Sequence, residues 1–192
     1  MKGREPGAVR ISAGRWKGRR LEVPDSARPT SGRARESLFD ILGERVAGAR
    51  VLDLHAGSGA VGIEAVSRGA SRAVLAEKDA AVLARNVGRL GAGPELSVLE
   101  ADAEEAVRRL SAAGERFEIV FSDPPYSSGA PPPAALEAVL AAEGVVVLQR
   151  DAGTPVPEVS GLTHFRERAY GRNIFDFFTR PPAPGTPGAG AR

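Results

Sequence analysis

Residues 49–65, ARVLDLHAGSGAVGIEA, contain the stretch that decides the fold. An apolar run leads into Gly57, Gly59 and Gly62, which form the pattern G-x-G-x-x-G, and Glu77 follows at the distance typical of a dinucleotide-binding motif. Closely spaced glycines between a strand and a helix let the backbone approach a nucleotide-like ligand, and the helix offers it free N–H groups. The pattern alone does not say which ligand.

The acidic residue before the glycines separates the candidates. Asp53 lies near the carboxyl end of the expected strand, where a carboxylate would repel a pyrophosphate and attract a cation. S-adenosylmethionine carries an ammonium and a sulfonium and no phosphate, so the sequence favours it. Glu77 is expected to accept both ribose hydroxyls, which either cofactor would present. Asp102, followed by Ala103, either accepts from an adenine amino group or caps the next helix.

Short apolar runs alternate with helical ones from residue 50 onward. The expected strands are Arg50–Leu54, Ala73–Glu77, Leu96–Glu100, Glu118–Ser122 and Val145–Gln149, and the expected helices are Ala60–Arg68, Ala80–Leu90, Ala103–Ala113 and Pro133–Ala142. This alternation predicts an α/β fold with a mostly parallel sheet and helices on both faces. Two final strands, Thr163–Ala169 and Ile174–Thr179, are joined by too short a link for a parallel crossover, so they must pair antiparallel.

The two ends of the chain differ from this middle part. Residues 1–30 include an expected hairpin, with strands Val9–Ala13 and Arg19–Val23, and an amphipathic helix over 31–47 begins the domain that extends to residue 180. The Pro/Gly-rich residues 181–192 are expected to be disordered.

The amino-acid composition and the charge distribution exclude several classes of function. The 192-residue chain contains no cysteine, which excludes disulfides, thiolate metal sites and the thiolate nucleophile normally used to methylate pyrimidine C5. It has no apolar run of about 20 residues and no signal-peptide pattern, so a cytoplasmic protein without membrane contact is expected. The net charge of +2 is uneven: residues 1–40 hold ten basic and five acidic side chains. This asymmetry favours a polyanionic partner, although a solvated arginine-rich surface remains the alternative.

A second motif, FEIVFSDPPY, occupies residues 117–126. Its two prolines fix φ, so the Asp123 carboxylate and the Pro124 carbonyl are held as acceptors at the end of a strand. Two acceptors suit an exocyclic amine, because hydrogen bonds from its two N–H groups would direct the lone pair at a methyl carbon. Tyr126 would stack on a flipped base. We expect Asp123, Pro124, Pro125 and Tyr126 to form the catalytic motif, without a metal ion; an ordinary proline-rich loop is the alternative.

The order of these motifs resembles a known family. The blocks RISAGRWKGRRLEVP, RPTSGRARESLFDIL, VLDLHAGSGAVGIEAVSRGA, LAEKD, FEIVFSDPPY and YGRN are similar to those of class I methyltransferases, and specifically of the D-type enzymes that methylate guanine N2 in 16S rRNA. The resemblance spans roughly residues 9–180. It implies a Rossmann-like, seven-stranded sheet of order 3-2-1-4-5-7-6, with strand seven antiparallel and an N-terminal hairpin that contacts RNA.

The resemblance also assigns residues to the two ligands. The expected cofactor contacts are Asp53, His55, Ala56, Gly57, Ser58, Gly59, Glu77, Lys78, Asp102 and Ala103. The expected RNA contacts are Arg10, Arg15, Trp16, Lys17, Arg19, Arg20, Arg28, Thr30 and Arg33, and Arg35 is drawn toward the same role. Trp16 stacks on RNA in this interpretation or packs inside its own turn.

Two positions depart from the family pattern. His55 stands where an aromatic residue is usual, and Gln149 stands where relatives commonly carry Glu. The favoured function is an S-adenosylmethionine-dependent guanine-N2 methyltransferase, a monomer acting on 16S rRNA within a small-subunit assembly particle. An N-methyltransferase for DNA adenine or a protein amide, a nicotinamide oxidoreductase and a non-catalytic RNA-binding module are the competing hypotheses.

Overall fold

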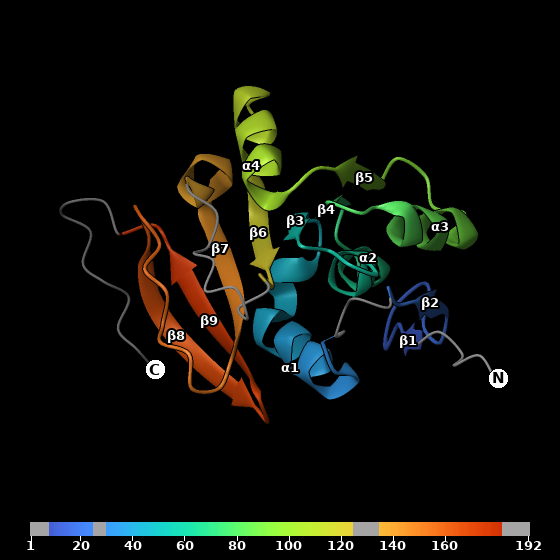
Figure 1. The fold of residues 1–192 in the computed structure, drawn as a ribbon, viewed down its shortest axis with the longest axis horizontal. Coiled ribbons are helices and arrows are strands. Elements are labelled where there is room, and N and C mark those ends of the chain that lie inside the picture. Colours follow the sequence, from blue (N-terminus) through green and yellow to red (C-terminus); the bar gives the residue numbers. More distant parts are fainter. Residues whose placement is uncertain (1–7, 25–29, 125–134, 182–192) are drawn as a thin grey trace.

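The sheet has the topology that the sequence predicts. The computed structural model describes residues 8–24, 30–124 and 135–181. In the described part, seven strands form one sheet of order β5-β4-β3-β6-β7-β9-β8 (Figure 1). These strands are β3 (Arg50–Leu54), β4 (Arg72–Glu77), β5 (Leu96–Glu100), β6 (Phe117–Ser122), β7 (Leu140–Asp151), β8 (Thr163–Tyr170) and β9 (Asn173–Thr179). β3 to β7 pair in parallel, and β9 is antiparallel to both β7 and β8, which confirms the predicted order.

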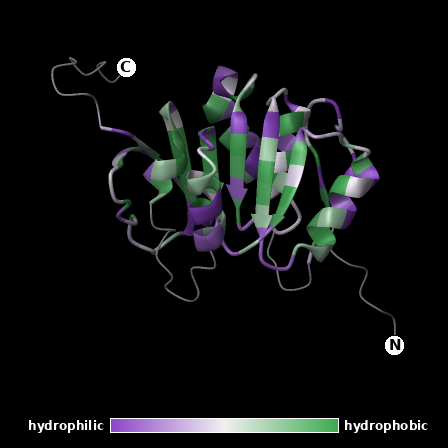
Figure 2. Cartoon of the chain, turned by 90° about the horizontal axis from the view of Figure 1, so that it is seen from above, coloured by the Kyte–Doolittle hydropathy of each residue, from purple (hydrophilic) through white to green (hydrophobic). Residues whose placement is uncertain are grey.

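Helices cover both faces of the sheet. α1 (Gly32–Leu42), α2 (Ala60–Ser67) and α3 (Ala81–Leu90) pack on one face, which we call the α1 face, and α4 (Ala103–Ala112) packs on the other, the α4 face. Alternate strand residues supply the two cores: Phe121 and Val147 point to the α1 face, and Val120 and Leu148 to the α4 face. Figure 2 shows long hydrophobic stretches along the central strands between helices of mixed hydropathy.

The expected helix Pro133–Ala142 is wrong over its described residues. Leu136–Val139 form a single 3₁₀ turn, η3, and β7 begins directly at Leu140. The Leu140 backbone pairs with Phe117, and its side chain is buried. The sequence around it is rich in strong helix formers, but pairing with β6 and burial under α4 outweigh that weak preference. The helix predicted over 31–47 is also divided, because α1 ends at Leu42 and a 3₁₀ helix, η1 (Gly43–Val46), follows.

The N-terminal hairpin is firmly docked on the main core. Its strands, β1 (Ala8–Arg10) and β2 (Arg20–Glu22), are shorter than expected. The turn between them reaches the end of α2, where the Arg15 N–H donates to the Ser67 carbonyl at 2.8 Å. Gly14 has φ +79, and a Cβ there would lie 1.7 Å from the same carbonyl oxygen. Only glycine therefore allows this close approach.

Within the described ranges, every helix is too short or too polar to cross a lipid bilayer.

Candidate active site

Asp53 lies beneath the glycine turn. Its side chain is 1% exposed, and Oδ2 accepts a hydrogen bond of 2.8 Å from the Gly62 N–H in the first turn of α2. Burial raises the pKa of Asp53 to about 7; the Gly62 bond opposes this shift, and the nearby carboxyls of Asp123 and Glu77 add to it. A Cβ at Gly62 would lie 2.0 Å from Leu75 Cδ2 and 3.2 Å from both Cβ and Oδ2 of Asp53. The third glycine of the motif therefore allows the helix to pack on the acid that precedes the turn, a contact that the sequence did not predict.

The turn itself is open toward the solvent side. Gly57 has φ +55, and in the described part of the chain no atom outside its immediate neighbours comes closer than 4.0 Å to a Cβ built there. Gly59 has φ +80, and its Cβ would instead lie 2.6 Å from Leu83 Cδ1. The first glycine thus leaves its backbone accessible to a ligand. The second allows the turn to pack closely against α3, because a side chain there would collide with Leu83.

His55 links the turn to the neighbouring strand. It is a non-glycine residue with φ 61, and its Nδ1 lies 3.2 Å from Ser122 Oγ in β6. Burial lowers the pKa of His55, so the imidazole is neutral near pH 7. Because Ser122 immediately precedes Asp123, the histidine joins the two predicted motifs.

The remaining expected cofactor residues lie at the same edge of the sheet. Glu77 Oε2 accepts from the Gly57 N–H at 2.7 Å, and Oε1 accepts from the Lys78 N–H at 2.9 Å. Asp102 Oδ1 accepts from the Glu105 N–H at 2.9 Å, so Asp102 is the N-cap of α4, the alternative left open by the sequence. Ala56, Ser58 and Ala103 are buried.

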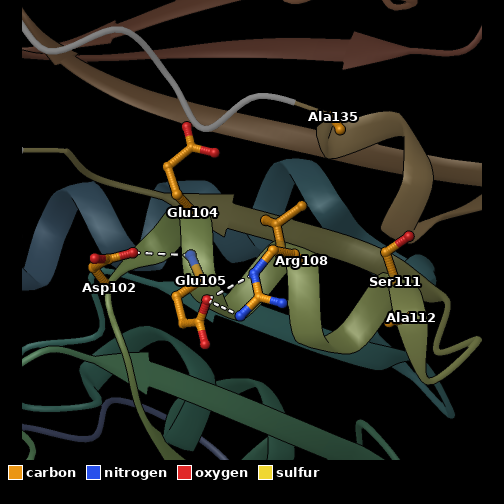
Figure 3. Close-up of a pocket in the computed structure, with 8 residues that line it drawn as sticks. Asp102, Glu104, Glu105, Arg108, Ser111, Ala112 and Ala135 are labelled. Carbon is orange, nitrogen blue, oxygen red and sulfur yellow. Dashed lines mark hydrogen bonds and ion pairs between the residues drawn. The ribbon is translucent and has the colours of Figure 1, made fainter.

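A pocket of about 640 Å³ lies along α4 (Figure 3). Asp102, Glu104, Glu105, Arg108 and Ala135 are among its lining residues. It shares only Asp102 and no catalytic-motif residue with the expected sites, so we do not assign the cofactor to it.

Asp123 is held at the end of β6 by a chain of side chains. Gln149 Nε2 donates to Asp123 Oδ2 at 3.0 Å, and Thr30 Oγ1 donates to Gln149 Oε1 at 2.9 Å. Thr30 and Gln149 are buried. Burial, with the nearby charge of Asp151, raises the pKa of Asp123 to about 7. Pro124 is buried, and Pro125 and Tyr126 lie outside the described residues.

The glycine turn and the Asp123 motif are neighbours because the strands that precede them, β3 and β6, are neighbours in the sheet. β3 and β6 pair in parallel with Leu54 opposite Ser122, so the glycine turn and Asp123 leave the sheet at the same edge. This edge therefore brings together three acidic side chains: Asp53, buried beneath the turn; Glu77, bonded to the Gly57 N–H; and Asp123, which is half-buried. Such an edge is where open α/β sheets bind ligands.

The expected RNA residues that the structure describes divide into three groups. Lys17, Arg20 and Arg33 are exposed and have no described bonding partner. Arg10, Arg15 and Arg19 are exposed but bonded within the protein, to Gly18, Glu95 and Arg89 respectively. Thr30 and Trp16 are buried, and Arg28 lies outside the described residues.

The buried position of Trp16 supports the turn-packing alternative. The side chain is 6% exposed, its backbone N–H donates to Ser67 Oγ at 2.9 Å, and the Arg15 guanidinium lies 4.8 Å from the ring centroid.

The expectation that Arg35 contacts phosphate is wrong. Arg35 is 1% exposed, and its Nε donates to Glu64 Oε2 at 2.6 Å. Glu64 is itself fully buried and also accepts from Ser12 and Arg68. This cluster joins α1, α2 and the hairpin. A lone arginine in a basic run gave no sign of burial, but Glu64 on the apolar helix α2 was a usable signal, because a buried carboxylate requires a partner.

Comparison with known proteins agrees with this arrangement. Ribosomal RNA small subunit methyltransferase D of Escherichia coli K12 is 44% identical over 128 residues, which are 64% of this chain and 63% of the relative. The match thus spans just under two thirds of that relative's length. The Bacillus subtilis protein named "Putative rRNA methyltransferase YlbH" is 33% identical over 178 residues, covering 85% of this chain and 94% of the relative.

Solved structures agree as well. The Escherichia coli protein described as "Putative methyltransferase yhhF" superimposes with a TM-score of 0.72 at 34% identity, covering 91% of this chain and 98% of that one. A family model described as "Conserved hypothetical protein 95" matches residues 9–179. The resemblance stated from the sequence is therefore confirmed, and the chain belongs to the conserved hypothetical protein 95 family, which includes the D-type ribosomal RNA methyltransferases.

Proposed function

We propose that this protein transfers a methyl group from S-adenosylmethionine to the exocyclic N2 of a guanine in 16S rRNA. The observation that carries the proposal is the half-buried Asp123 acceptor, fixed by Gln149 at the end of β6 beside the glycine turn after β3. The names of the relatives support RNA as the substrate.

The residues at the edge of the sheet fit the cofactor. Gly57 leaves an open backbone surface, and Glu77 offers acceptor oxygens next to it for the ribose hydroxyls. Asp53 lies beneath the turn and stabilises the conformation of the turn through its bond to the Gly62 N–H. Among the described residues, no basic side chain pairs with Asp53 or Glu77. A sulfonium and an ammonium suit this acidic edge better than a pyrophosphate does. Neutral His55 is placed to pack on the ligand.

The bound cofactor supplies an electrophilic methyl carbon, and the chain supplies position and acceptors. Asp123 and the Pro124 carbonyl accept hydrogen bonds from the two amine hydrogens, which turns the nitrogen lone pair away from the ring. Placing both reactants in one geometry provides most of the rate enhancement. The methylated nitrogen must then lose one proton. With a pKa of about 7, Asp123 is the group placed to accept it.

The RNA side of the proposal rests on the exposed basic residues. Lys17, Arg20 and Arg33 are exposed and pair with no acidic side chain of the described residues, so their charges can contact phosphates, and Arg28 is assigned to the same role by the resemblance. The proposed partner is 16S rRNA in a small-subunit assembly particle, bound by one copy of the chain. The proposed location is the cytoplasm.

The direct test is methyl transfer with a labelled donor. The protein is incubated with labelled S-adenosylmethionine and either unmethylated small ribosomal subunits, protein-free 16S rRNA or duplex DNA, and the modified base is mapped. Label on guanine N2 of the ribosomal RNA supports the proposal. Label on DNA adenine, or no label on any RNA, contradicts it.

The raised pKa of Asp123 predicts a pH-dependent rate. Because the carboxylate form accepts the amine hydrogens, kcat is expected to rise about tenfold per pH unit below about 7 and to level off above it. Replacing Asp151 by Asn removes the neighbouring negative charge and should move the midpoint to lower pH without changing the plateau. A profile that is flat from pH 5.5 to 8.5 would contradict this role.

Gln149 is predicted to position Asp123. In Gln149→Leu the carboxylate loses its donor, so kcat should fall roughly tenfold to a hundredfold, while the Kd for S-adenosylmethionine changes little. Gln149→Glu places a second carboxyl beside Asp123 and should move the pH midpoint of kcat upward. If Gln149 had only a structural role, Gln149→Glu would leave the pH midpoint of kcat unchanged. The shift of this midpoint is therefore the deciding measurement.

A further inference from the structure

The edge strand β8 exposes an unusual row of side chains. All of its residues are exposed except Tyr170, which is half-buried, and in the described part of the fold it pairs only with β9. Arg166, Arg168 and Tyr170 lie opposite Phe177, Phe175 and Asn173 of β9. Phe177 and Phe175 belong to the α1-face core, so these side chains lie on the α1 face. Phe165, at a bulge and 54% exposed, also contacts Phe177, with ring centroids 6.2 Å apart. We call Phe165, Arg166, Arg168 and Tyr170 the β8 strip.

The register places this strip in line with the proposed catalytic residue. Arg168 is opposite Phe175 in β9, and Phe175 is opposite Gln149 in β7. The Gln149 side chain in turn contacts Asp123. Since neighbouring strands are about 4.8 Å apart, the backbone of Arg168 lies about 10 Å from that of Gln149 on the same face of the sheet. The β8 strip therefore lies two strand spacings from Gln149, the residue that contacts the proposed catalytic Asp123.

The charges of the strip are free on this face. Among the described residues no hydrogen bond or ion pair engages the Arg166 guanidinium, and the Arg168 guanidinium donates to the backbone carbonyl of its neighbour, Glu167. The carboxylate of Glu167 points to the other face, where it pairs with Arg150. The acidic residue of the strand is thus paired away from the strip, and no acidic side chain of the described residues compensates the two positive charges on the α1 face of β8.

We propose that the β8 strip binds the phosphate backbone of the substrate RNA next to the target nucleotide; this inference rests on the proposed function. Arginine guanidinium groups recognise phosphate oxygens with paired hydrogen bonds. Flanking aromatic rings provide surfaces on which unpaired bases stack. The hairpin β1–β2 and the strand β8 lie at opposite ends of the molecule (Figure 1). An RNA that contacts both the hairpin and β8 would therefore pass over the edge of the sheet that carries Asp123.

Pairing with another protein strand is the competing use of an edge strand. It is disfavoured here because the bulge at Phe165 interrupts the regular ladder, and because charged side chains on an edge oppose strand addition. The strip therefore fits a polyanion better than a second β-sheet.

The test compares two variants of equal charge change. Arg166→Gln with Arg168→Gln neutralises the strip. The control, Arg45→Gln with Arg116→Gln, neutralises an arginine of η1 that donates to the Glu143 carbonyl near the start of β7 and an arginine just before β6, both away from Asp123. Binding of protein-free 16S rRNA and of isolated small subunits is measured from 50 to 300 mM salt. For the strip variant, Kd should increase roughly fivefold to thirtyfold. The slope of log K against log salt should become shallower by about 1.4 to 1.8, the value for two lost phosphate contacts.

Each outcome decides the inference. Weaker binding and a shallower slope in the strip variant alone support it. If the slope of log K against log salt is the same in the wild type and the strip variant, and the wild type still methylates RNA, then the strip does not bind RNA but the proposed function stands. Loss of binding to subunits only, with unchanged binding to protein-free RNA, would mean that a ribosomal protein is the partner. A wild type that binds no RNA overturns both proposals. A thermal shift with S-adenosylmethionine confirms that each variant is folded.

Discussion

Replacing Asp123 by Ala is expected to lower kcat by at least about a thousandfold, while the Kd for S-adenosylmethionine stays within about threefold. The variant lacks the acceptor that orients the amine and takes its proton, but it keeps the glycine turn and Glu77. Single-turnover kinetics and calorimetric titration of the cofactor measure the two quantities separately.

Loss of folding does not explain this expected result. The pKa of Asp123 in the folded protein, about 7, lies above the value of about 3.9 in an unfolded chain. Its contribution to stability is therefore fully present below about pH 4 and is lost as the pH rises through about 7. At pH 8 the Ala variant should be at least as stable as the wild type. Asp123→Asn, which keeps one acceptor oxygen, should retain more activity than Asp123→Ala. Wild-type kcat in the Ala variant would remove Asp123 from the mechanism.

The second large effect is on stability. Replacing Glu64 by Ala should lower the free energy of unfolding by about 3–5 kcal/mol, because it leaves the Arg35 guanidinium, 1% exposed, without its carboxylate. For a chain of this size that corresponds to a melting temperature lower by roughly 6–20 °C. Although burial opposes it, hydrogen bonds from Ser12, Arg35 and Arg68 lower the pKa of Glu64, which agrees with a charged, fully engaged group.

Glu118→Ala is the matched control. It removes an ion pair with Arg50 in which both side chains are 41% exposed, so it should cost less than about 1 kcal/mol. Differential scanning calorimetry of both variants gives the comparison. If Glu64→Ala melts no lower than Glu118→Ala, the buried cluster does not hold the hairpin to the core as described.

The parallel α/β arrangement and the antiparallel pairing of the last two strands could be predicted because they rest on periodicity and link length, whereas the order of the strands was implied by the family resemblance. The apolar runs around Val51, Leu75 and Val120 are short, regularly spaced and separated by helical patterns, and the link at Gly171 is too short for a crossover. These signals are local. The stretch before β7 could not be predicted in the same way, since its composition favours a helix and only pairing of Leu140 with Phe117 makes it a strand.

The candidate site was predictable in position but not in contacts. The two motifs follow strands that pair, so their meeting at one edge follows from the topology. The contacts of Gln149 with Thr30 and Asp123 join residues far apart in the sequence, and no local pattern marks them. Arg35 illustrates the same limit, because its burial depends on a carboxylate in a different helix.

The most direct test of the account is a crystal structure with S-adenosylmethionine bound. Because the turn after β3 and the acceptor after β6 share one edge of the sheet, the cofactor should lie along that turn, with its ribose at Glu77 and its methyl carbon directed toward Asp123. A cofactor found elsewhere on the molecule, or bound at the turn with its methyl carbon directed away from Asp123, would contradict the account.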